Sequence, residues 1–128
     1  MFIFGHPWID SPRFVKVFSV EQIEKSSPEE ILLLEPLNVS IELAKHCQRN
    51  GLRYAVTLND IRDGIFANAL GASFVVTEHE LAITLQKIAE DYLFDTKILV
   101  LIEDERRIET MVRFGIDGVI FPAAIAQS

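Results

Sequence analysis

This sequence of 128 residues has little cysteine and no cluster of basic residues, and each of these absences excludes a class of function. Cys47 is the only cysteine. The chain therefore has no disulfide framework, and we expect a reducing, cytoplasmic location. The longest basic run is Arg106-Arg107, directly after three acidic residues, and the net charge is −7. Nucleic acids and anionic membranes require clustered cations, so we expect neither as a partner.

Long apolar segments and nucleotide-binding loops are also missing. No apolar run approaches the roughly 20 residues that span a bilayer. The apolar start, Met1 to Phe4, is too short for a secretion signal. The sequence contains no Gly-rich phosphate loop, no C-x-x-C pair and no G-x-S-x-G motif. We therefore expect a soluble protein with no cofactor and no catalytic residue of a known motif.

Short apolar runs do recur along the chain and predict β-strands. Most of these runs are continuous rather than alternating, which is typical of parallel strands covered on both faces. Segments with helical periodicity lie between them, and Gly71 and Gly115 stand where a left-handed cap would close a helix. The predicted strands span residues 14–18, 31–34, 54–58, 74–76, 98–102 and 119–121.

This alternation predicts one α/β domain over residues 1–128. We expect a three-layer sandwich with a mostly parallel sheet of five or six strands, flavodoxin- or receiver-like. Residues 1–13 do not fit the pattern and are expected to form an irregular N-terminal arm, in which residues 2–4 could add an edge strand.

Over residues 31–125 the chain resembles the receiver domains of bacterial response regulators. The segments that carry the resemblance are Ile31–Pro36, Phe74–Glu78 and Gly115–Pro122. The resemblance implies a five-stranded α/β fold with a phospho-accepting aspartate after the third strand. Glu78 replaces that aspartate, Ile102 stands at the position of the switch threonine or serine, and no lysine precedes Pro122. The resemblance thus implies a degenerate receiver. A half-length relative of the (βα) barrels would give the same pattern of elements.

Polar side chains follow four of the predicted strands. Because the carboxyl ends of parallel strands lie at one edge of a sheet, these side chains would form a candidate ligand rim. One interpretation is a site for a divalent cation, which prefers oxygen ligands. The other is that the same residues cap or stabilise the helices that follow. The rim consists of Glu35, Asn59, Asp60, Glu78, His79, Glu103 and Asp104.

The N-terminal arm carries the most distinctive side chains. His6 and Trp8 lie close to Phe2 and Phe4 in the sequence. The imidazole could act as an acid, a base or a ligand. Alternatively, the aromatic rings cover an exposed apolar edge, for example across a homodimer interface. Cys47 lies on the apolar stripe of a predicted helix, where a buried, inert thiol is expected.

Two functional hypotheses follow from these observations. The first is a non-catalytic regulatory or protein-interaction module that forms a homodimer through the arm. The second is a small enzyme, or a binder of a divalent metal or small molecule, that uses the acidic rim. A structure distinguishes them by the presence or absence of a pocket with converging polar groups at the strand ends.

Overall fold

The computed structural model describes residues 1–127, which form a single parallel sheet surrounded by helices. All of the strand pairs in this range are parallel. The strands are β1 (Phe2–Phe4), β2 (Phe14–Lys16), β3 (Ile31–Leu34), β4 (Tyr54–Thr57), β5 (Phe74–Thr77), β6 (Lys97–Leu101), β7 (Gly118–Ile120) and β8 (Ile125–Gln127). The helices are α1 (Val20–Lys25), α2 (Leu37–Arg49), α3 (Ile61–Ala69), α4 (His79–Asp91), α5 (Arg107–Arg113) and the 3₁₀ turn η1 (Pro122–Ala124).

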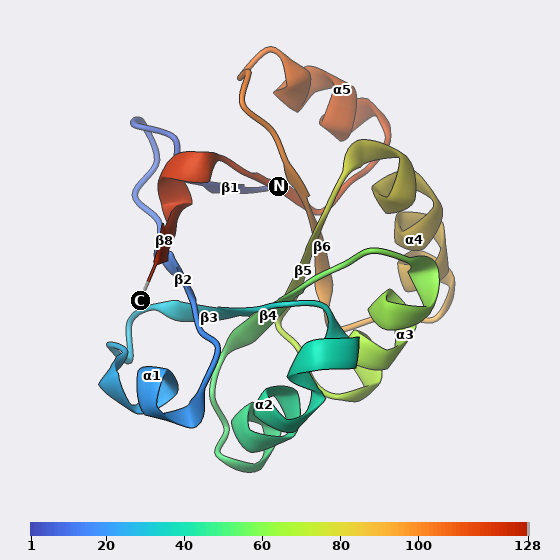
Figure 1. Cartoon of the computed structure of the whole chain (residues 1–128). Coiled ribbons are helices and arrows are strands. Elements are labelled where there is room, and N and C mark those ends of the chain that lie inside the picture. The colour runs from blue at the N-terminus through green and yellow to red at the C-terminus, as the bar shows by residue number, and fades with distance from the viewer. Residues whose placement is uncertain (128) are drawn as a thin grey trace.

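The expected α/β class with a parallel sheet is confirmed, but the expected sheet of five or six strands in a three-layer sandwich is wrong. Over the described residues the sheet has eight strands in the order β1-β7-β6-β5-β4-β3-β2-β8, and it curls into a half-barrel with the helices outside (Figure 1). From β3 to β7 each strand pairs with the next strand along the chain. Because each successive parallel strand twists in the same sense, this sequential order bends the sheet round on itself.

Apolar residues on the two faces of the sheet form two separate clusters. The outer cluster lies between the strands and the helices and includes Cys47, Leu85 and Met111. Burial raises the pKa of the Cys47 thiol to about 11, so this thiol stays protonated at neutral pH. The inner cluster lies inside the curl and is built almost entirely from strand residues: Phe4, Phe14, Ile31, Leu33, Ala55, Phe74, Val76, Leu99, Ile120 and Ala124.

Three phenylalanine rings fill the centre of the inner cluster. The ring of Phe14 meets the ring of Phe4 edge-on at a centroid distance of 4.9 Å, and the Phe74 ring lies 5.3 Å from Phe4. Edge-to-face contacts of this kind stabilise aromatic pairs beyond the apolar area they bury. The interior of the half-barrel is therefore a packed core.

Backbone contacts hold the two ends of the chain together where β1 meets η1. The N–H of Phe121 donates to the carbonyl oxygen of Phe4 at 2.9 Å. Gly5 has a φ of +88°, and a Cβ there would lie 2.8 Å from the backbone nitrogen of Ala124. Only glycine combines this left-handed conformation with so close an approach. The arm therefore leaves β1 in a fixed direction.

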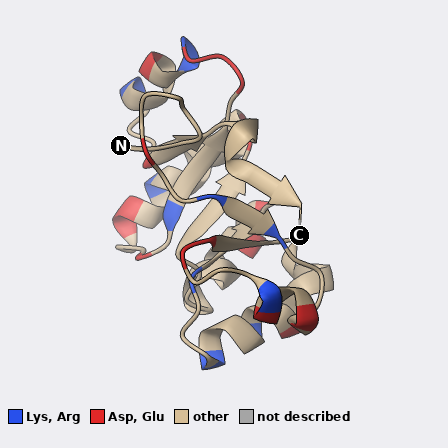
Figure 2. Cartoon of the chain, turned by 90° about the vertical axis from the view of Figure 1, so that its left-hand side faces the viewer, with Lys and Arg blue, Asp and Glu red and all other residues tan. Residues whose placement is uncertain are grey.

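Helices cover the half-barrel unevenly. The described α-helices lie outside the sheet, whereas the side formed by β1 and β8 carries mainly the arm (Figure 1). Seen from this side, most residues of the strands are uncharged, and the charged residues lie chiefly on the surrounding helices and loops (Figure 2). Among the described residues, no helix has the length and apolar character needed to cross a membrane.

Candidate functional site

Backbone and side-chain hydrogen bonds fix the arm that follows β1. The N–H of Ile9 donates to the carbonyl oxygen of His6 at 3.0 Å, which closes a turn over residues 6–9. The N–H of Gly5 donates to the hydroxyl oxygen of Ser11 at 3.2 Å, which folds the rest of the arm back onto its start. The expected irregular arm is thus an ordered loop, and residues 2–4 within it form the edge strand β1.

His6 is the centre of this loop. Its Nδ1 accepts the backbone N–H of Trp8 at 3.1 Å, so the ring proton must lie on Nε2. Nε2 lies 2.6 Å from the Oε2 of Glu105, to which it donates. The ring also packs edge-on against Trp8 and Phe121 at 5.5 and 5.6 Å. A neutral imidazole with both nitrogens engaged positions the arm and has no free nitrogen to act as a base.

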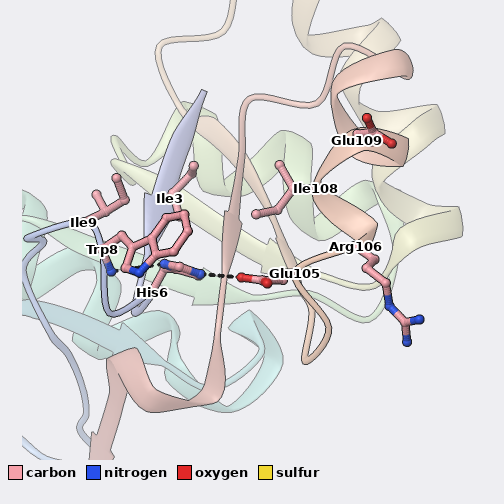
Figure 3. Close-up of a pocket in the computed structure, with 8 residues that line it drawn as sticks. All are labelled: Ile3, His6, Trp8, Ile9, Glu105, Arg106, Ile108 and Glu109. Atoms are coloured by element: carbon pink, nitrogen blue, oxygen red, sulfur yellow. Dashed lines mark hydrogen bonds and ion pairs between the residues drawn. The ribbon is translucent and has the colours of Figure 1, made fainter.

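An apolar groove lies between the arm and α5, and we call it the arm groove. It has a volume of about 490 Å³. Its apolar walls come from β1, the arm and α5, and its acidic groups and its arginine come from α5 and the loop before it (Figure 3). The residues that line it are Ile3, His6, Trp8, Ile9, Glu105, Arg106, Ile108 and Glu109.

Trp8 stands out at this groove because its side chain is largely exposed, with 87% of the residue accessible to water. Ile9 beside it is 45% exposed. Large apolar side chains in contact with water lose the hydrophobic free energy that burial would provide. Trp8 is therefore an exposed indole on a loop that the hydrogen bonds of His6 hold in place.

Some charged residues of the groove have a partner of opposite charge and others do not. Arg106 makes a bidentate contact with Asp104, with its Nη2 2.7 Å from Oδ2. Hydrogen bonds from the side chain and backbone of Arg106 hold the pKa of Asp104 at about 2. Arg106 also points away from the His6–Glu105 pair (Figure 3). Within residues 1–127, Arg106–Asp104 is the only ion pair that involves a lysine or arginine, and Glu109 forms no ion pair there.

The residues of the predicted rim lie at one edge of the sheet, as the parallel strands require, but they make different contacts. Asp60 caps α3, because its carboxylate accepts the N–H of Asp63 at 2.8 Å. Glu78 occupies the N-cap position of α4 without a side-chain capping bond. Nδ1 of His79 accepts a hydrogen bond from Nη2 of Arg107 at 3.0 Å. Helix capping therefore accounts for Asp60, whereas Asp104 is held by the contact with Arg106 described above.

Two further hollows lie at the carboxyl ends of β4, β5 and β6, with volumes of about 870 and 340 Å³. Glu78 lines both hollows, and Asn59 lines the smaller one. The larger hollow also brings together three other rim residues, His79, Glu103 and Asp104. Glu35 follows β3 and lines neither of them. In the part of the chain described, no three His, Cys, Asp or Glu side chains lie where they could share a metal ion.

The residues predicted to form an interface separate into two groups. His6 and Trp8 both line the arm groove. Phe2 is 43% exposed at the edge of the sheet, and its ring packs against Phe4 and Phe74. Phe4 is only 5% exposed because its side chain points into the half-barrel, so it belongs to the core.

Sequence reasoning missed the residues that α5 and the loop before it bring to the groove. Glu105 lies 99 residues from His6 along the chain, and no local pattern connects them. The sequence pattern places Ile108 only on an amphipathic stripe. Ile108 lies at the N-terminal end of α5, and there its side chain also forms part of the wall of the arm groove.

No family model matches the chain, and no curated protein matches it.

Proposed function

We propose that this chain is a non-catalytic protein-interaction module that binds its partner through the arm groove, with Trp8 as the anchor. The observation that carries the proposal is the 87% exposure of Trp8 on a loop whose conformation is fixed by hydrogen bonds. Tryptophan is among the residues that contribute most to protein interfaces. An anchor that is already ordered loses little conformational entropy on binding, which favours affinity.

The states of the His6 ring and of the Cys47 thiol support a non-catalytic role for the arm groove. Both ring nitrogens of His6 are engaged. Cys47 is fully buried, and its raised pKa keeps it in the unreactive thiol form. The groove therefore offers shape, apolar surface and charge rather than a reactive group.

In-cell photocrosslinking tests this function. A photoreactive benzophenone side chain replaces Ile9, which lies beside Trp8, in cells that naturally contain the protein. We expect a discrete protein adduct at position 9, and we expect the additional substitution Trp8→Ala to remove it, because a truncated hot-spot residue costs at least about 2 kcal/mol of binding free energy. Mass spectrometry identifies the adduct, including the homodimer that the sequence suggested.

Leu93 provides the matched control position. It is 86% exposed and follows α4, at the end of the half-barrel opposite the arm. Adducts that are the same at positions 9 and 93, or that persist after Trp8→Ala, would contradict the proposed function.

A further inference from the structure

We infer that the arm groove binds a protein segment in which a lysine or arginine side chain lies next to an aliphatic one. This inference rests on the proposed function and specifies the partner. It follows from three features of the groove: its charge, the exposed face of Trp8 and its apolar walls.

The charge of the groove is negative because its two glutamates are not neutralised. The hydrogen-bond pattern makes His6 a neutral donor, so the charge of Glu105 is not cancelled by its contact with Nε2. Glu109 forms no ion pair within residues 1–127. Arg106 is the one cation among the described residues that line the groove, and its charge is satisfied by Asp104. Complementary charge on a partner is therefore positive.

The indole of Trp8 reinforces this preference. Tryptophan has the most favourable aromatic face for a cation, and a guanidinium or ammonium group within about 6 Å of the ring centre is attracted to it. Trp8 and Glu105 are connected through His6, which contacts both. A cationic side chain placed over the indole thus lies close to a carboxylate as well.

The apolar walls account for the aliphatic neighbour. Ile3 and Ile108 both line the groove, and Ile9 adds to its apolar surface beside Trp8 (Figure 3). A partner with only charged groups would leave this surface in water. A second copy of the chain fits the charge less well, because each copy carries a net charge of −7 and would bring two acidic surfaces together.

The test is a calorimetric titration of the whole chain with three short peptides. The first alternates leucine with arginine, the second has glutamine in place of arginine, and the third has glutamate. We expect saturable binding of the arginine peptide alone, weakening as the salt concentration rises. The double substitution Glu105→Gln and Glu109→Gln should weaken this binding roughly tenfold at low salt. The carboxamide oxygen that this variant carries at position 105 can still accept the proton of His6, so the arm keeps its conformation.

Trp8→Ala should weaken binding of the arginine peptide at least about thirtyfold, and Tyr92→Ala, at an exposed aromatic residue outside the groove, should not change it. Equal binding of the glutamine or glutamate peptide that still depends on Trp8 would overturn the inference and leave the proposed function intact. Argininamide binding as tightly as the peptide would also overturn it, because the apolar walls would then contribute nothing. No binding of any peptide would overturn it as well, and the crosslinking experiment would decide the proposed function independently.

Discussion

Replacing Phe14 by alanine is expected to lower the free energy of unfolding by about 3–5 kcal/mol. Phe14 is completely buried, and its ring contacts the rings of Phe4 and Phe74 at the centre of the half-barrel. Strands surround the site, so it cannot collapse to fill the cavity left by the ring. A loss of this size is a large share of the roughly 5–15 kcal/mol that stabilises a typical domain.

Equilibrium unfolding in urea, followed by circular dichroism, measures this loss. Phe18→Ala is the matched control, because Phe18 lies two residues beyond β2 and is 55% exposed. It should change the free energy of unfolding by less than about 1 kcal/mol. A loss below about 1 kcal/mol for Phe14→Ala would mean that the inner cluster is not packed as described.

The contact of β1 with β7 leaves no room for a side chain at Gly118. Gly118→Ala should destabilise the chain by about 1–3 kcal/mol and release the arm, because a Cβ cannot be accommodated there without moving the strand. This Cβ would lie 2.7 Å from the Cβ and 2.8 Å from the carbonyl oxygen of Phe2. The neighbouring atoms include backbone, so relief requires β1 to shift, and the arm follows β1.

Fluorescence of Trp8, the only tryptophan, reports directly on this release. We expect the fluorescence anisotropy of Gly118→Ala to fall below that of the wild-type chain. Gly51→Ala is the control: Gly51 has a φ of +63° with open space around it, so alanine there costs strain but should leave the arm in place. Unchanged anisotropy in Gly118→Ala would show that β1 does not hold the arm.

The periodic part of the fold could be predicted from sequence. All six predicted strands are present within one or two residues, and helices lie between them as the periodicity predicts. Gly71 and Gly115 have φ values of +81° and +68°, as predicted for left-handed residues that close a helix. Local apolar patterns determine these elements, because each element buries its own stripe or run.

The number of strands could not be predicted, and the sequence did not distinguish a half-barrel from the flat receiver-like sheet that was expected. β8 has only three residues and contains an alanine and a glutamine, so it has no strand pattern of its own. Its strand conformation comes from pairing with β2. The sequence also does not show which residues point into the half-barrel. Both faces of β3 and β5 are buried, so their apolar runs are continuous and have no alternation that would separate inner from outer residues.

The functional site could be predicted only in part. His6 and Trp8 stand out in the sequence because they are unusual residues in a short, non-periodic segment. Glu105, Ile108 and Glu109 reach the groove because β1 pairs with β7 and β7 pairs with β6, which places the end of β6 and the start of α5 near β1. A contact of this kind depends on strand order, and local sequence patterns do not determine strand order.

Trp8 is exposed to water, and we expect it nevertheless to be held rigidly; NMR relaxation of its indole N–H tests this most directly. The chain has one tryptophan, so the spectrum contains a single indole signal. We predict an order parameter near that of rigid backbone, about 0.85. A value below about 0.6 would show a freely moving side chain and contradict the account of Trp8 as an ordered anchor.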